Sequence, residues 1–204
     1  SVLAAYQAGK NTIEDCMNDS LISSFMYKGL FEEIIPSMDG DKELLTTYAG
    51  DVLNRFRNPY IVHLLLSISL NSTSKFKTRD LPSLLGYIEK EGKLPPVLVF
   101  SLASLISFYE GKKKEDGSYM GSRNGEEYKI MDSPDVISFF DSLYSREYKS
   151  VEEKASVLSS SVLKKTEWWG EDLTKVKGLE KLVEEDLVKI WSLGMTKALV
   201  SIVE

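Results

Sequence analysis

Apolar residues recur every three or four positions along most of this chain, the spacing expected of helices that bury one face. Proline, glycine and capping residues divide the pattern into segments. We predict helices from the start of the chain to about Gly9 and over the ranges 20–35, 41–56, 80–91, 97–109, 134–146, 150–163, 179–191 and 195–203. Because no long run alternates between apolar and polar residues, the predicted fold class is all-α, with residues 1–204 forming a single helical domain.

One segment departs from the helical pattern. Residues 111–129 are polar and contain several glycines, so we predict a surface loop here. Within this Gly111–Lys129 loop, residues 119–121 and 128–130 have the composition of two short strands, and they predict a β-hairpin. The basic run Lys112–Lys114 is followed at once by Glu115 and Asp116, which is typical of a solvated loop.

The stretch from Arg55 to Pro82 has the most unusual pattern. We predict a helix capped by Asn58, with Pro59 in its first turn. Apolar residues surround the axis of this helix, so it should be buried on nearly all sides. One stripe is nevertheless polar and recurs at three- or four-residue steps: His63, Ser67, Asn71 and Ser74. Because buried polar groups cost free energy unless they have partners, the stripe indicates a residue set that lines a cleft.

Three cations follow the stripe at alternate positions: Lys75, Lys77 and Arg79. In a chain of net charge −6, positive charge concentrated beside a polar stripe suggests an anionic ligand. The same net charge argues against nucleic acid as a partner, since phosphate binding needs a basic surface. We also expect no membrane partner, because no apolar run approaches the roughly 20 residues of a membrane span.

The composition excludes several kinds of active site. A single cysteine, Cys16, rules out an intramolecular disulfide and a multi-cysteine metal site, and it fits a reducing cytoplasm. The single histidine, His63, rules out multi-histidine zinc motifs; it could be a general base or a hydrogen-bonded core residue. The run Ser72–Lys75 matches the S-x-x-K signature of penicillin-binding enzymes, but the supporting S-D-N and K-T-G motifs are missing, and we reject this interpretation.

The same stretch resembles a known family. Arg55-Phe56-x-Asn58-Pro59, followed by Ser74-Lys75 and Leu81-Pro82, is similar to the C-terminal domain of the polyol-specific long-chain dehydrogenases, typified by mannitol 2-dehydrogenase. Further motifs resemble the tagaturonate reductase branch, also called altronate oxidoreductase: FEEIIP (31–36), RFRNPYIVH (55–63), LNSTSKFKTRDLPSLLGYI (70–88), LVFSLASLISFYEG (98–111) and WGEDL (169–173). The resemblance covers nearly the whole chain. It implies a multi-helical substrate domain like those of mannitol dehydrogenase and 6-phosphogluconate dehydrogenase.

The resemblance implies a two-domain enzyme in which an N-terminal Rossmann-like domain binds NAD and a helical C-terminal domain closes the substrate cleft. This sequence contains no G-x-G-x-x-G fingerprint and no K-x-x-x-x-N-x-x-H, the catalytic signature of the family. We therefore expect the chain to begin just after the catalytic signature, to lack the NAD-binding domain, and to be inactive alone with no cofactor bound. For the intact enzyme the implied reaction is the NADH-dependent reduction of tagaturonate to altronate, and its reverse.

The resemblance also implies which residues face the substrate. In the polyol relatives, a lysine matching Lys75 and an arginine eight residues before it contact the substrate; here the arginine position is Ser67. A hexuronate carries a carboxylate that mannitol lacks, and a cation is its natural partner. We therefore predict Lys75 as the carboxylate receptor, followed by Arg79 and then Lys77. His63, Ser67 and Asn71 are predicted to line the same cleft.

Two alternatives stay open at this point. The substrate could be a mannonate- or mannitol-type polyol compound rather than tagaturonate. The chain could also be a helical interaction module without catalytic ancestry, since an all-α domain with no complete catalytic set fits such a module equally well.

Overall fold

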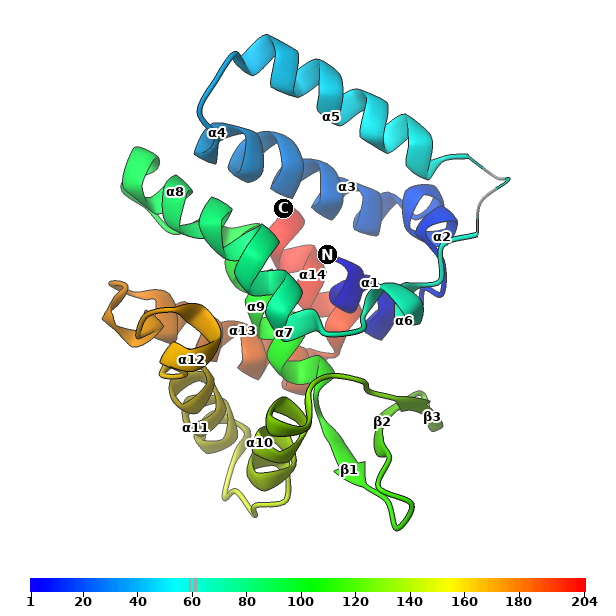
Figure 1. Ribbon diagram of the computed structural model, residues 1–204, viewed down its shortest axis with the longest axis vertical. Helices are drawn as coiled ribbons and strands as arrows, with labels where there is room; N and C mark the ends of the chain where they lie inside the picture. Colours follow the sequence, from blue (N-terminus) through cyan, green and yellow to red (C-terminus); the bar gives the residue numbers. More distant parts are fainter. Residues whose placement is uncertain (59, 61) are drawn as a thin grey trace.

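The computed structural model describes residues 1–58, 60 and 62–204, and most of these residues are helical (Figure 1). The α-helices are α1 (Val2–Gln7), α2 (Ile13–Asn18), α3 (Ser20–Lys28), α4 (Ile35–Ser37), α5 (Lys42–Phe56), α6 (Leu65–Ile68), α7 (Ser72–Lys75), α8 (Leu81–Glu91), α9 (Pro96–Phe108), α10 (Pro134–Tyr144), α11 (Val151–Leu163), α12 (Thr166–Trp169), α13 (Leu179–Leu193) and α14 (Met195–Val203). Two π-helical turns, η1 (Gly29–Ile34) and η2 (Phe76–Asp80), and the 3-10 turn η3 (Leu173–Lys175) join neighbouring helices. The predicted helical fold class is confirmed.

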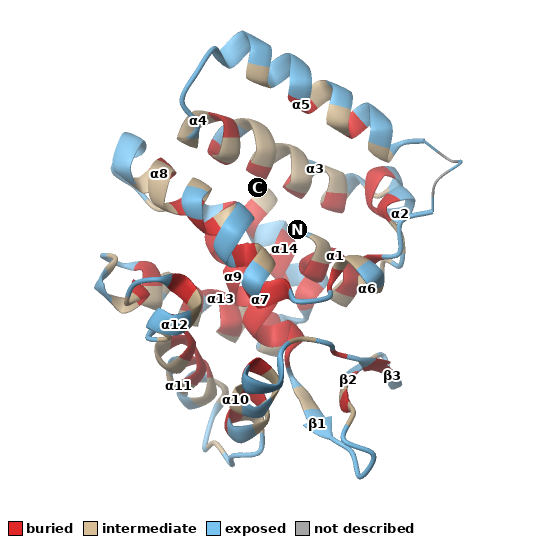
Figure 2. Cartoon of the chain, viewed as in Figure 1, coloured by how far each residue is buried: buried red, intermediate tan, exposed pale blue. Residues whose placement is uncertain are grey.

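The centre of the domain is helix α9, and every residue from Val97 to Phe108 is buried. Helices α1, α11, α13 and α14 pack around it. Its three serines do not interrupt this packing, because their hydroxyls have partners. Ser101 accepts a hydrogen bond from the amino group of Ser1 (3.4 Å), Ser104 donates to the carbonyl of Phe100 (2.8 Å) and Ser107 to the side-chain oxygen of Gln7 (2.7 Å). Figure 2 shows the contrast with α5, which is exposed along most of its length and buries only Ala49 and Leu53.

The Gly111–Lys129 loop folds into an antiparallel sheet of strands β1 (Gly111–Lys113), β2 (Tyr119–Arg123) and β3 (Glu126–Lys129), in that order. The predicted hairpin is confirmed, with Gly121 opposite Tyr128 and Met120 opposite Lys129. Strand β1 was not predicted, because Gly-Lys-Lys has no strand pattern of its own and is held by pairing with β2. The lysines at 112–114 are exposed, as expected of a solvated loop.

The predicted buried helix after Asn58 is wrong. Its residues form the short helices α6 and α7, which are interrupted at Asn71, and Val62 and Leu64 are 70% and 51% exposed. Hydrogen bonds from the connection between α1 and α2 take the place of helical ones: the amide of Ile13 donates to the carbonyl of His63 (3.0 Å), and the amide of Leu65 donates to that of Asn11 (2.8 Å). These partners lie some 50 residues away, so the local pattern could not reveal them.

Asn58 acts as a turn residue rather than a helix cap, since its side-chain oxygen accepts a hydrogen bond from the amide of Tyr60 (3.0 Å). The predicted first-turn Pro59 and the apolar Ile61 lie outside the described residues.

Two predicted helix boundaries also move. The helix that starts at Asp19 was expected to end at Pro36, yet helical structure continues to Ser37, with Pro36 in the first turn of α4 after the π-helical turn η1. The helix expected to begin at Asp80 begins at Ser72 instead, since α7, η2 and α8 run on without interruption. Lys75 and Arg79 therefore lie on helical rather than extended backbone.

Two glycines should respond to alanine in opposite directions. A Cβ at Gly121 would lie 2.5 Å from the Tyr128 ring, which is held because its hydroxyl donates to the carbonyl of Phe108 (3.1 Å). We expect Gly121→Ala to lower the free energy of unfolding by about 1–3 kcal/mol through overpacking. Gly50 lies inside α5 with open space around its Cβ position, so Gly50→Ala should raise the free energy of unfolding by about 0.4–1 kcal/mol. Urea unfolding of both variants tests this, and a shift in the same direction would contradict it.

Candidate functional site

A cavity of about 470 Å³ lies between α5, the α3–η1 helix, α9 and the helical run through α7 and η2. Most of its wall is apolar, with side chains such as Met26, Leu30, Val52, Phe56, Ile68 and Val97. Its polar lining residues are Ser1, His63, Ser72, Lys75, Arg79, Asp80 and Ser101, and all but Ser1 and Ser101 come from the segment between residues 63 and 80. An apolar hollow with a few convergent polar groups is typical of a small-molecule site.

Lys75 is the last residue of α7 and is half-buried at the cavity wall. Its ammonium donates to the carbonyl of Ile68 at the end of α6 (2.8 Å). An ammonium has three N–H donors, so this bond orients the side chain and leaves two donors for a ligand. The long apolar stem of Lys75 packs along the wall, which keeps the charge at a defined place.

Arg79 lies one helical turn after Lys75, on η2, and lines the same cavity. Residues four apart share a helical face, so the two cations lie on the same side of the helix. Asp80 follows directly, and its half-buried carboxyl also lines the cavity. Burial raises the pKa of the Asp80 carboxyl above its usual range. The polar end of the cavity thus combines two cations with one carboxyl group.

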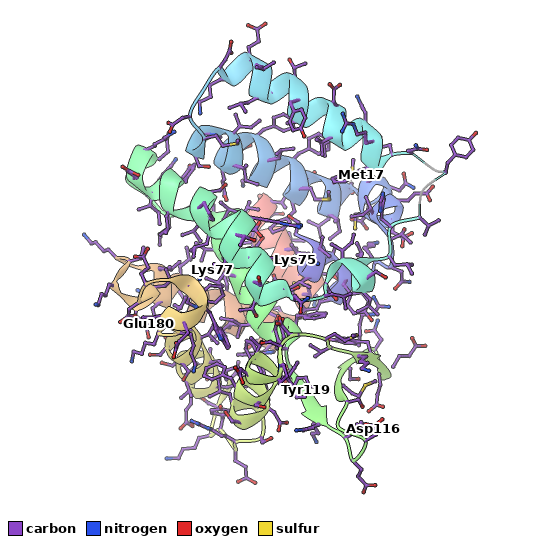
Figure 3. All side chains as sticks on the ribbon, in the orientation of Figure 1. Met17, Lys75, Lys77, Asp116, Tyr119 and Glu180 are labelled. Carbon is purple, nitrogen blue, oxygen red and sulfur yellow. The ribbon has the colours of Figure 1, made fainter. Side chains whose placement is uncertain are left out.

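The predicted site residues divide into two groups. Lys75, Arg79 and His63 line the cavity, although His63 comes from the extended, exposed segment before α6 rather than from a helix. Lys77, Ser67 and Asn71 are exposed and do not line it. Figure 3 labels Lys75 and Lys77 on the same helical run, where a two-residue step turns the side chain by about 200°.

The predicted stripe does not form because its members lie on different pieces of backbone. Ser67 is on α6, whereas Asn71 precedes α7 in the left-handed conformation, with φ 54°. The chain therefore turns between them, and one helical face no longer connects the two.

Sequence reasoning missed Asp80 as a cavity residue, since it was interpreted only as a helix start. The available signal in the sequence was an acidic residue directly beside a cluster of cations.

The structure also gives no support to a catalytic Ser–Lys pair at the S-x-x-K match. The hydroxyl of Ser72 donates to the carbonyl of Ser69 (2.6 Å), and the Lys75 ammonium donates to the carbonyl of Ile68.

We also searched for a metal site, a reactive cysteine and membrane-spanning helices. Within residues 1–58, 60 and 62–204, no group of three or more His, Cys, Asp and Glu side chains could hold a metal ion. Cys16 is buried, and burial raises the pKa of its thiol to about 11, so little nucleophilic thiolate forms near neutral pH. None of the helices described here has the length and apolar character needed to cross a membrane.

Sequence comparisons with known proteins give one family. The model of the mannitol dehydrogenase C-terminal domain family matches residues 2–191. The altronate oxidoreductases of Klebsiella pneumoniae subsp. pneumoniae and of Escherichia coli O1:K1 are each 41% identical over 197 residues, which is 97% of this chain and 38% of the relative. The chain thus spans less than two-fifths of the length of these relatives.

Two solved structures have the same fold. The mannitol 2-dehydrogenase of Pseudomonas fluorescens, in a ternary complex with NAD and D-mannitol, superposes with a TM-score of 0.79 at 20% identity, over 98% of this chain and 38% of that one. A D-sorbitol dehydrogenase in substrate-free form gives a TM-score of 0.69 at 16% identity, over 97% of this chain and 37% of that one. The family match extends over nearly the whole chain, and the chain belongs to the mannitol dehydrogenase C-terminal domain family.

Proposed function

We propose that this chain forms the substrate-facing wall of an NAD-dependent hexuronate oxidoreductase that interconverts tagaturonate and altronate. The observation that carries the proposal is the pair of cations, Lys75 and Arg79, one helical turn apart at the polar end of an otherwise apolar cavity. The 41% identity to altronate oxidoreductases supports the choice of a hexuronate over other substrates of the family.

The chemistry of the cavity suits a substrate with one carboxylate and several hydroxyls. Lys75 has two N–H donors beyond its bond to Ile68, and the Arg79 guanidinium can donate two parallel hydrogen bonds to a carboxylate. The Asp80 carboxyl can accept hydrogen bonds from sugar hydroxyls. The resemblance implies an arginine at the position of Ser67 in the polyol relatives, but Ser67 is exposed and does not line the cavity, so we assign the anion contact to Lys75 and Arg79.

The remaining parts of the enzyme are proposed to come from outside this chain. Reduction of a ketone needs a hydride donor and a proton donor. The sequence contains no dinucleotide fingerprint, and its β1–β3 sheet is antiparallel, so these residues do not fit an NAD site. An N-terminal Rossmann-like domain would hold the NAD and the catalytic lysine. The exposed Tyr60, Val62 and Leu64 provide an apolar surface for it to cover.

We place this enzyme in the cytoplasm, where NAD-dependent sugar metabolism operates and where one unpaired, buried cysteine is stable. Family membership favours this assignment over a helical interaction module. The fold shared with mannitol 2-dehydrogenase keeps an uncharged polyol as the alternative substrate.

An activity comparison tests the proposal. We expect the full-length protein to oxidise NADH with tagaturonate and to prefer tagaturonate over fructose, because only tagaturonate carries the anion that Lys75 and Arg79 can bind. The isolated 204-residue chain should show no activity with either ketose. Loss of NADH absorbance measures both. A preference for fructose would instead support the polyol alternative, and activity of the isolated chain would contradict the assignment of the chemistry to another domain.

A further inference from the structure

The helix that carries Lys75 and Arg79 begins without a cap of its own. The helical run from α7 through η2 to α8 starts at Ser72, and the side chain of the preceding residue, Asn71, makes no capping hydrogen bond. The first amides of a helix need acceptors from elsewhere, and an uncapped start frays readily. Lys75 lies in this first turn, so whatever holds the turn also determines where its ammonium points.

The missing acceptor comes from a residue 59 positions further along the sequence. Asp132, in the connection between β3 and α10, accepts a hydrogen bond from the amide of Thr73 at its Oδ2 (3.3 Å). Beside it, the amide of Asn71 donates to the carbonyl of Met131 (3.0 Å). Two consecutive residues of this connection, Met131 and Asp132, thus accept hydrogen bonds from amides at the start of α7.

The Asp132 carboxylate is itself held in place. Its Oδ2 also accepts a hydrogen bond from the Tyr109 hydroxyl, and its Oδ1 accepts one from the amide of Ser133 (2.7 Å). Tyr109 is fully buried at the end of α9, where its ring stacks on Phe140 with the centroids 4.3 Å apart. The Tyr109 hydroxyl also accepts a hydrogen bond from the Thr73 hydroxyl (3.4 Å). The buried Tyr109 therefore holds Asp132, and the two side chains together hold the first turn of α7.

We infer that Asp132, supported by Tyr109, is a positioning residue for recognition of the substrate anion: it fixes the first turn of α7 so that the Lys75 ammonium is presented to the cavity. This inference rests on the proposed function, because it assigns Lys75 the carboxylate contact. Asp132 does not line the cavity and acts only through the helix start. Without it, Lys75 would sample several orientations, and the enzyme would bind a carboxylated ketose less tightly without losing its chemical step.

The test compares variants of the full-length protein by steady-state kinetics. Asp132→Ala should raise the KM for tagaturonate by about tenfold while kcat changes by less than about threefold, since only binding of the anion is affected. The KM for fructose, which lacks the carboxylate, should stay unchanged. The matched control is Asp135→Ala, which removes the same charge from an exposed residue at the start of α10 and should change neither KM.

A double-mutant cycle separates positioning from general destabilisation. If Asp132 acts through Lys75, Asp132→Ala should have little further effect on the KM for tagaturonate once Lys75→Ala is present. Additive effects of the two substitutions, or equal losses on tagaturonate and fructose, would overturn the inference. Should Asp132→Ala fail to fold, Tyr109→Phe removes one hydroxyl and keeps the stacked ring, and it should raise the KM for tagaturonate alone.

Failure of this inference and failure of the proposed function give different results. If Lys75→Ala itself leaves the KM for tagaturonate unchanged, the proposed function fails. If Lys75→Ala raises this KM and Asp132→Ala does not, only the positioning role fails. Amide hydrogen exchange of residues 71–76 gives a readout independent of substrate: it should be faster in Asp132→Ala than in Asp135→Ala, and equal rates would overturn the inference.

Discussion

Replacement of Lys75 by alanine in the full-length protein should raise the KM for tagaturonate by about 30- to 150-fold. Loss of one charge-assisted hydrogen bond costs about 2–3 kcal/mol, which corresponds to that range. Half-buried at the cavity wall and already oriented by Ile68, Lys75 pays little further entropy when it binds a carboxylate. The KM for fructose should rise by less than about threefold, and steady-state kinetics with both ketoses measures the difference.

Lys77 is the matched control for this experiment. Lys77→Ala removes the same charge two residues further along the same helical run, at an exposed position outside the cavity. It should leave both KM values within about twofold of the wild type, since a surface charge in salt contributes little. Equal losses from the two substitutions would show a general electrostatic effect instead of a defined receptor. An equal loss on tagaturonate and fructose in Lys75→Ala would remove the anion argument.

Replacement of Glu33 by glutamine should lower the free energy of unfolding by about 1–3 kcal/mol at pH 5. Glu33 is 2% exposed, and its two carboxyl oxygens accept hydrogen bonds from the amides of Val97 (2.7 Å) and Leu98 (2.8 Å) at the start of α9. Pro95, the residue before α9, offers no capping side chain, so Glu33 supplies the cap for the central helix. Glutamine would direct an NH₂ group at one of these amides and leave it unpaired.

The cost of this substitution should depend on pH. Burial raises the pKa of Glu33 to about 7, from an ordinary value of 4.5, and outweighs the opposing effect of the two amides. Between these values the folded protein binds more protons than the unfolded chain, so the contribution of Glu33 to stability falls as pH rises. Glutamine does not titrate. The difference in the free energy of unfolding between wild type and Glu33→Gln should therefore be largest near pH 5 and become smaller towards pH 8.

Thermal and urea unfolding between pH 5 and 8 measure this difference, with Glu32→Gln as the control. Glu32 is the exposed neighbour of Glu33, and its substitution should change stability by less than about 0.5 kcal/mol at every pH. A difference that widens as pH rises would show that the negative charge at the helix start, rather than its burial, dominates at Glu33.

Local signals predicted much of this fold. The helices predicted to begin at residues 20 and 41 begin within one residue of these positions, where Asp19 and Asp41 accept hydrogen bonds from first-turn amides. The helix predicted to end at residue 91 does so, and Gly92 follows it in the left-handed conformation. These features depend on residues a few positions apart, so the sequence pattern contains them directly. The helix predicted over 97–109 is α9, although its complete burial was not predicted.

The cavity residues were only partly predictable. Lys75 and Arg79 were identified because a resemblance and a charge pattern pointed to them, and their separation by four residues places both on one face of the helical run. Ser67, Asn71 and Lys77 were predicted to lie with them, but they do not line this cavity. The helix that would have aligned the first two gives way to hydrogen bonds with Asn11 and Ile13, and these partners are far away in the sequence.

By itself the sequence determined the helical class and most helix boundaries, since caps and periodicity operate within a few residues of backbone. Only the tertiary structure decided that residues 62–64 are exposed and lie outside a helix, that Asp80 joins the cavity, and that Asp132 holds the start of α7 from 59 residues away. Each of these depends on which residues from distant parts of the sequence lie close together in space, and a local pattern of apolar and polar residues contains no information on that distance.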